Sequence, residues 1–160
     1  MIEFTPMGET DFQEYLALSV HDYADENVRA GAWDREGALD KSRKAFDQML
    51  PDGRSTEGHR LLRITDTDRQ VAVGIIWYMV RSGAGSQGAY ICDIRIDEAF
   101  RRQGYARRAL LHLEDELVRQ GVSRVGLHVF SHNAGARSLY ESLGYAATGI
   151  NMVKHINSRS

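Results

Sequence analysis

Apolar and polar positions alternate along this chain with two different periods, which predict a series of helices and strands. Apolar side chains recur at helical spacing across residues 11–31 and again across residues 34–50. Asp34 suits the N-cap of the second helix, and Pro51 follows its end. A short strand at residues 2–7 precedes both. The first 50 residues are therefore expected to supply one strand and two helices.

The rest of the chain reads mainly as strands, joined by turns and by two further helices. Strand character is expected at residues 59–65, 70–80, 90–97, 122–130 and 146–156, the last as one or two final strands. The first two form a predicted hairpin, and the glycine-rich residues 81–88 are interpreted as a long hairpin connection. Helices are expected at residues 106–121 and 134–143. This order predicts one domain over residues 1–160, of the α/β class, with helices on both faces of a mixed sheet.

The composition is that of an ordinary soluble globular domain. Hydrophobic residues make up 42% of the 160 residues, charged residues make up 26%, and the net charge is −2. A dedicated nucleic-acid binder would usually be strongly basic, so no nucleic-acid partner is expected. The amino terminus lacks the features of a signal peptide, and no apolar run approaches the roughly 20 residues of a membrane span. We expect a cytoplasmic protein with no membrane partner.

Thiol and metal chemistry find little support in the sequence. Cys92 is the only cysteine, so no intrachain disulfide can form. Its apolar strand favours a buried, inert thiol over a nucleophile. No His and Cys residues have the spacing of metal ligands, so no metal site is expected.

The strongest chemical signal lies between the strand at residues 90–97 and the helix that follows it. Residues 101–106 read Arg-Arg-Gln-Gly-Tyr-Ala at a strand-to-helix junction. The start of a helix exposes N–H groups that bind phosphate, and Gly104 allows a close approach that a Cβ would obstruct. Tyr140 follows Asn133 by seven residues, so the two share one helical face. An anion cradle followed by a positioned phenol indicates a nucleotide-linked group-transfer enzyme.

Three segments together resemble the Gcn5-related N-acetyltransferase (GNAT) superfamily. Residues 101–106 match its pyrophosphate motif, Gln/Arg-x-x-Gly-x-Gly/Ala, and residues 91–97 look like its fourth strand. Residues 132–145 are similar to its later signature, an asparagine and a tyrosine seven positions apart before a Gly-Phe or Gly-Tyr pair. The resemblance implies a GNAT-like mixed, mostly antiparallel central sheet with a splay between the fourth and fifth strands, flanked by helices on both faces.

By this resemblance the protein uses acetyl-CoA as its cosubstrate. In the family, the splayed strands free main-chain groups that pair with the pantetheine arm and polarise the thioester carbonyl. Asn133 has two interpretations, a helix N-cap and a contact to the cofactor. Arg107 and Arg108 either face the cofactor or form a solvated helix surface. The implied cofactor-binding residues are Ile94, Arg95, Ile96, Arg101, Arg102, Gln103, Gly104, Tyr105, Ala106, Asn133 and Arg137.

The resemblance further implies direct attack of a neutral amine on acetyl-CoA, with no acyl-enzyme. Tyr140 is the implied general acid that protonates the departing sulfur; the alternative is a core aromatic residue. Asp93 is the leading candidate for the general base; the alternative is that it holds neighbouring backbone or the substrate. Some relatives carry a glutamate one place earlier, where this chain has Cys92.

Several other titratable residues have both a structural and a functional interpretation. His128 is most simply interpreted as a structural histidine, and His132 as an ordinary loop residue. The first helix carries Asp22, Asp25 and Glu26, which either attract a cationic amine or form a solvated face.

The sequence thus leads to one principal function and one alternative. The principal function is an N-acetyltransferase that acts on a primary amine of a small molecule or peptide; the alternative is a non-catalytic acyl-CoA-binding or sensing domain. A dinucleotide-dependent oxidoreductase is disfavoured, because no Gly-x-Gly-x-x-Gly element follows a strand. The strand character of residues 146–156 also suggests pairing with a neighbouring copy, so a homodimer is expected.

Overall fold

The computed structural model describes residues 1–83 and 85–156. Its strands are β1 (Ile2–Pro6), β2 (His59–Asp66), β3 (Val71–Gly83), β4 (Ser86–Ile96) and β5 (Val122–Leu127). Its helices are α1 (Glu9–Arg29), α2 (Ala38–Met49), α3 (Tyr105–Arg119) and α4 (Ala134–Ser142), with short 3₁₀ turns at Gly53–Ser55 and Glu98–Phe100. Within these residues, no helix combines the length and the apolar character needed to cross a membrane.

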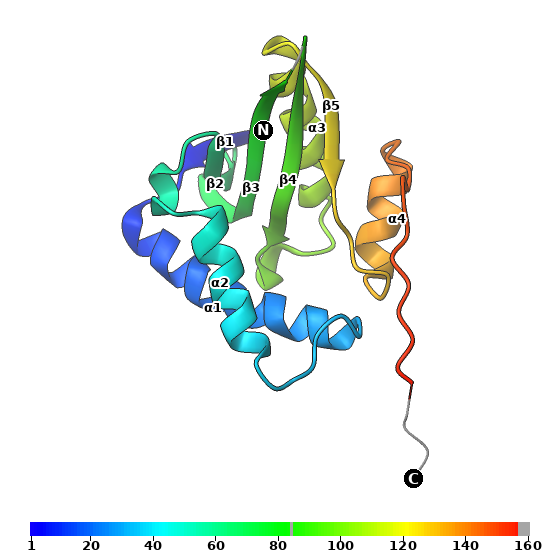
Figure 1. Cartoon of the computed structure of the whole chain (residues 1–160). Helices are drawn as coiled ribbons and strands as arrows, with labels where there is room; N and C mark the ends of the chain where they lie inside the picture. The colour runs from blue at the N-terminus through cyan, green and yellow to red at the C-terminus, as the bar shows by residue number, and fades with distance from the viewer. Residues whose placement is uncertain (84, 157–160) are drawn as a thin grey trace.

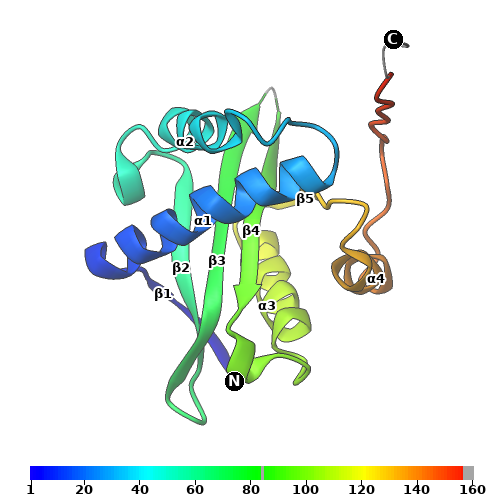
Figure 2. The same cartoon turned by 90° about the horizontal axis from the view of Figure 1, so that it is seen from below.

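The strands form one sheet in the order β1-β2-β3-β4-β5. The first four pair antiparallel, and β5 pairs parallel to β4 after the crossover through α3. Figures 1 and 2 show α1 and α2 over one face of the sheet and α3 over the other, with α4 beyond β5. The expected mixed, mostly antiparallel sheet with helices on both faces is therefore present.

Two apolar clusters hold these layers together. One joins the sheet to α3, whose leucines Leu110, Leu113 and Leu117 are almost completely buried. The other joins the opposite face to α1 and α2 around Phe46 and Trp77. Burying a leucine or phenylalanine side chain contributes about 1.5–3 kcal/mol, so both helical layers are firmly attached to the sheet.

A β-bulge in β4 changes which side chains share a face of the sheet. Trp77 lies opposite Asp93, whereas the next residue, Tyr78, lies opposite Ile91, so Cys92 is the extra residue on β4. Trp77 and Met79 project from one face of β3, and their partners Asp93 and Tyr90 project from that face too. The bulge thus brings Tyr90 and Asp93 to the same side, under α1 and α2.

β5 accompanies β4 over only part of its length. The parallel pairing ends at Ile91 and Leu127, while β4 continues to Ile96 in contact with β3. The predicted strand at residues 122–130 is therefore too long, because its last three residues leave β4. This separation is the expected splay between the fourth and fifth strands.

Two local expectations are wrong. Asp34 is not the N-cap of α2, since Gly37 adopts a φ of +76° outside the helical region and α2 begins after it. The predicted long connection at residues 81–88 is mostly strand, because Arg81 pairs with Gly88 and Ser82 with Gln87. Ala84, within that expected connection, lies outside the described residues.

The final strands expected at residues 146–156 are absent from the described part of the chain. This segment has no regular secondary structure, and its apolar side chains Ile150, Met152 and Ile156 are exposed. A strand needs hydrogen-bonding partners, and Figure 1 shows the segment leading away from the sheet after α4. Its pairing with a second copy of the chain stays a prediction.

We predict that the close approach of β3 to β4 requires a glycine at Gly74. A Cβ at this position would lie 2.1 Å from the carbonyl oxygen of Arg95, so Gly74→Ala should lower the free energy of unfolding by about 1–3 kcal/mol. Gly135→Ala is the matched control, because nothing lies within 4 Å of its Cβ position in α4. The control should leave stability unchanged or raise it by up to about 1 kcal/mol. Urea denaturation measures both; wild-type stability of Gly74→Ala would contradict this strand register.

Candidate active site

A cavity of about 1140 Å³ opens where β4 and β5 separate. Its walls come from α1 and α2, the bulged part of β4, the start of α3 and one side of α4. The candidate site residues that line it are Asp93, Ile94, Arg95, Ile96, Arg101, Arg102, Gly104, Tyr105, Ala106, Asn133 and Tyr140. Segments far apart in the sequence therefore meet around a single space.

The start of α3 forms the cationic end of this cavity. Gly104 adopts a φ of +78° as the N-cap, and nothing lies within 4 Å of the position that its Cβ would occupy. The N–H groups of the first helical turn have no partners within the helix, and the helix dipole adds partial positive charge there. Arg101, Arg102 and Arg107 line the same end, and the Arg101 Nε donates to the carbonyl oxygen of Ile96 at 3.0 Å. The arrangement suits an anionic group such as a pyrophosphate.

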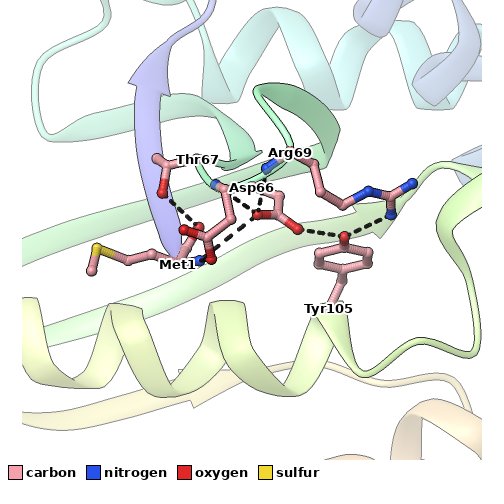
Figure 3. A network of polar contacts seen from close by, with 6 residues as sticks. Met1, Asp66, Thr67, Arg69 and Tyr105 are labelled. Atoms are coloured by element: carbon pink, nitrogen blue, oxygen red, sulfur yellow. Dashed lines mark hydrogen bonds and ion pairs between the residues drawn. The ribbon is translucent and has the colours of Figure 1, made fainter.

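A polar network braces this helix start from the turn between β2 and β3 (Figure 3). The Tyr105 hydroxyl donates to Asp66 Oδ2 at 2.6 Å, and both residues are almost fully buried. Arg69 donates to the same hydroxyl at 3.1 Å and to Gln103 Oε1 at 3.4 Å. The amino group of Met1 lies 3.7 Å from Asp66 Oδ1. Tyr105 therefore fixes the helix start through its hydroxyl, whose partners Asp66 and Arg69 do not line the cavity.

Asn133 and Tyr140 reach the cavity from α4. The Asn133 side chain accepts a hydrogen bond from the Ala136 N–H at 3.3 Å, which confirms the N-cap interpretation, while the residue also lines the cavity. Tyr140 is half-buried, packs against the core and faces Tyr145 edge-on with ring centroids 5.8 Å apart. Burial, and to a smaller extent the negative charge of Asp93, raises the pKa of Tyr140. Its phenol therefore keeps its proton at neutral pH.

Asp93 forms the centre of a second polar cluster, on the α1 side of the cavity. The Tyr15 hydroxyl donates to Asp93 Oδ2 at 2.6 Å. Arg95 Nη2 lies 3.1 Å from Asp22 Oδ2 and 3.7 Å from Asp93 Oδ2. Burial raises the pKa of Asp93, and the Tyr15 hydrogen bond and Arg95 oppose that rise. The pKa of Tyr15 is raised well above its ordinary value by burial and by Asp93, so Tyr15 acts as a donor to the carboxylate.

Of the other titratable candidates, His128 and Cys92 line the cavity, whereas His132 is not part of its lining. The His132 side chain is hydrogen-bonded to Glu26 of α1. His128 is exposed, and its ring packs edge-on against the ring of Phe130, with ring centroids 4.9 Å apart. Burial raises the pKa of Cys92 to about 12, so at neutral pH this residue is a thiol, not a thiolate nucleophile.

Two of the thirteen candidate residues do not reach the cavity lining. Gln103 donates to the Ala99 carbonyl oxygen at 3.3 Å, and Arg137 pairs with Glu141 at 2.8 Å on the exposed surface of α4. Conversely, sequence reasoning missed Tyr15 and Asp66. Tyr15 looked like any apolar position of a helix, and Asp66 looked like a turn residue; neither carries a local signal of its distant partner.

Comparison with known proteins places this geometry in a family. The model of the acetyltransferase (GNAT) family matches residues 20–145. The uncharacterized N-acetyltransferase YycN of Bacillus subtilis is 36% identical over 155 residues, which is 97% of this chain and 99% of that protein. Its crystal structure has a TM-score of 0.92 at 35% identity, covering 99% of this chain and 100% of the other. The chain therefore belongs to the acetyltransferase (GNAT) family, and the expected membership and fold are confirmed.

The name of a further relative states which protein receives the acetyl group. The ribosomal protein bS18-alanine N-acetyltransferase of Salmonella typhimurium is 37% identical over 93 residues, which is 58% of this chain and 59% of that protein. Both relatives are N-acetyltransferases by name.

We predict that the bond between Asp66 and Tyr105 makes stability depend on pH in the acidic range. The Tyr105 hydroxyl is the largest cause that lowers the pKa of Asp66 in the folded protein; burial opposes it. A depressed folded pKa stabilises the protein above the unfolded value, about 3.9 for aspartate. That stabilisation decreases as pH falls below the unfolded value and is lost once pH has fallen through the folded pKa. Asp66→Asn should therefore be less stable than wild type at neutral pH, and the gap should narrow below about pH 4. Thermal unfolding across pH measures this. Tyr105→Phe should show the same narrowing; a gap independent of pH in both variants would contradict the assignment.

Proposed function

We propose that the protein is an N-acetyltransferase that transfers the acetyl group of acetyl-CoA to a primary amine by direct attack. The observation that carries this proposal is one cavity that joins a helix start at Gly104, suited to an anion, to a protonated phenol, Tyr140, and a half-buried carboxylate, Asp93. Each group alone has a structural explanation. Their convergence around the splay between β4 and β5 matches what acyl transfer needs: phosphate binding, a proton donor and a group that can hold an amine.

The residues at the cationic end fit the cofactor. The N–H groups after Gly104 would bind its pyrophosphate, with Arg101 and Arg102 supplying positive charge. On the open side of β4, the backbones of Ile94 and Ile96 lie beyond the last pair with β5 and would bind the pantetheine arm. Acetyl-CoA supplies the activated acyl group, and the protein supplies orientation and electrostatics.

The acceptor amine must lose its proton before it attacks the thioester. A lysine-like ammonium with a pKa of about 10.4 costs roughly 4.6 kcal/mol to neutralise at pH 7, against about 1 kcal/mol for an α-amine. Asp93 is the group in the cavity best placed to hold the amine and receive its proton, since burial has made this carboxylate more basic. Its hydrogen bond from Tyr15 limits that basicity, which favours an amine of low pKa.

Tyr140 completes the transfer in this proposal as the general acid. Its phenol is protonated at neutral pH because burial raises its pKa, and it reaches the cavity from the helix that begins at Asn133. Protonation of the departing sulfur by a positioned phenol avoids the expulsion of a free thiolate.

We predict that Gly104→Ala weakens CoA binding. A methyl group would project into the open space at the helix start, and loss of one hydrogen bond to a charged group costs about 1.5–3 kcal/mol, or roughly ten- to a hundredfold in affinity. Gly121→Ala is the matched control: its φ is +79°, so it carries the same backbone strain of about 1–2 kcal/mol, at the other end of α3. Calorimetric titration with CoA should separate the two. Equal affinities of the two variants for CoA would contradict the assignment of residues 101–106 as the pyrophosphate site.

We predict that Tyr140→Phe lowers kcat by about 10²–10⁴-fold when proton transfer to sulfur limits turnover. The ring and its packing remain, so thermal stability and CoA affinity should change little. The measurement is acetyl-CoA consumption over polyamines, amino acids, aminoglycosides and peptides with free amino termini. If the variant keeps the full wild-type kcat while the chemical step limits turnover, Tyr140 is a core aromatic residue and not the general acid. CoA binding without turnover of any amine would instead support the non-catalytic acyl-CoA-binding domain.

A further inference from the structure

A second hollow of about 690 Å³ adjoins the acceptor side of the cavity. It lies at the hairpin end of β3 and β4, the end opposite the start of α3, and Figure 1 shows this hairpin projecting beyond α1 and α2. Met49 and Tyr90 line both spaces, so the hollow continues the cavity outward. Each of these two side chains is more than a third exposed, which makes them an apolar surface that a ligand can cover.

Two arginines, Arg81 and Arg124, lie on the same face of the sheet in this hollow, with one strand between them. Arg81 on β3 lies opposite Gly88 on β4, and Gly88 lies opposite Arg124 on β5. Directly opposite residues project from the same face, and adjacent strands are about 4.8 Å apart, so the two arginine Cα atoms are roughly 10 Å apart. Gly88 places no side chain between them. Both arginines are exposed, and no acidic residue is among the described residues that line the hollow.

The positive charge of Arg81 acts on Cys92, which lines the main cavity. Burial and then Asp93 raise the pKa of Cys92, while Arg81 acts in the opposite direction. Moving outward from Asp93, a ligand therefore meets the apolar surface of Tyr90 and Met49 and then two exposed arginines, Arg81 and Arg124.

The carboxylates of the cavity are already engaged, which disfavours an acceptor with several positive charges. Asp22 pairs with Arg95, and Asp93 accepts the Tyr15 hydroxyl. Glu26 bonds to His132. These three are the only acidic residues among the described residues that line the cavity. A second ammonium group of a polyamine or aminoglycoside would find no unpaired carboxylate there, and further out it would meet the two arginines.

The spacing along β4 defines the length of the acceptor. The bulge adds one residue to β4 between Asp93 and Gly88, so these two residues lie opposite positions of β3 that are four residues apart. A strand rises about 3.3 Å per residue, so the two points are separated by roughly 13 Å. A free amino acid is too short to span this distance. An extended peptide advances about 3.3–3.6 Å per residue and spans it with four or five residues.

We propose that the acceptor is the amino terminus of a peptide or protein chain that carries acidic residues at about its fourth and fifth positions. This inference rests on the proposed function. The α-amine lies at Asp93, the following residues cross Tyr90 and Met49, and the acidic side chains bind Arg81 and Arg124. Bidentate pairing of arginine with carboxylate supplies both charge and geometry for this recognition.

Three peptides of one length and a blocked carboxyl terminus test the proposal, with glutamate, glutamine or lysine at positions four and five. With acetyl-CoA and wild-type protein at low ionic strength, the glutamate peptide should have a KM about tenfold below that of the glutamine peptide at similar kcat. The lysine peptide should have the highest KM, and the differences should shrink in high salt. The double variant Arg81→Gln, Arg124→Gln should raise the KM of the glutamate peptide about tenfold and leave the glutamine peptide unchanged. Arg119→Gln, at the exposed end of α3, is the control and should change neither.

Titration of the same peptides into the CoA-loaded protein provides a readout that needs no turnover. A glutamate preference that disappears in the double variant, with unchanged thermal stability, supports the proposal by either measurement. Equal KM and Kd for all three peptides, a preference for lysine, or a preference that survives the double variant overturns it. Turnover of a polyamine in preference to every peptide also overturns it while leaving the acetyltransferase function intact. Failure of that function looks different, since no amine would then be acetylated.

Discussion

The incomplete pairing of β4 is the constraint on which the rest of this structure depends. Along one edge, β4 keeps its hydrogen bonds to β3 as far as Ile96; along the other, its pairing with β5 ends at Ile91. Backbone groups beyond that point must find partners elsewhere, because unpaired buried N–H and C=O groups are costly. The bulge at Cys92 occurs at the same place and turns Asp93 towards α1. One local departure from sheet regularity therefore creates the opening and selects the side chains that face it.

The helix start that borders this opening is held from a distant part of the sheet. The loop before α3 contains Arg102 with a φ of +62°, a conformation that is unfavourable for a residue with a Cβ unless the surroundings fix it. Gly104 follows with a φ of +78°, which glycine adopts readily. Tyr105, Arg69 and Asp66 provide that support through hydrogen bonds between the turn of the β2–β3 hairpin and the first residue of the helix. The β2–β3 hairpin thus contributes to the cofactor side of the cavity although none of its turn residues line it.

The sequence predicted the parts of this structure that local chemistry determines. The period of apolar residues located the four helices, and the loop at residues 101–106 together with Asn133 and Tyr140 identified two walls of the cavity. The failures concern partners that are distant in the sequence. Residues 146–156 have strand composition, yet a strand also needs a free neighbour, which composition cannot supply. Tyr15 donates a hydrogen bond to Asp93, which is 78 positions away in the sequence, and no sequence pattern near either residue predicts that contact.

The helix that carries Tyr140 is also the one least anchored to the core. None of the residues of α4 is fully buried, whereas each of α1, α2 and α3 buries at least three. Local opening costs less free energy where fewer apolar contacts are broken, so among these helices α4 is expected to detach at the lowest free-energy cost. In the proposed enzyme, the proton donor and one wall of the cofactor cavity therefore belong to the same weakly anchored helix. Opening of α4 would withdraw the phenol and widen the exit for product in a single motion, which couples the end of the chemical step to release.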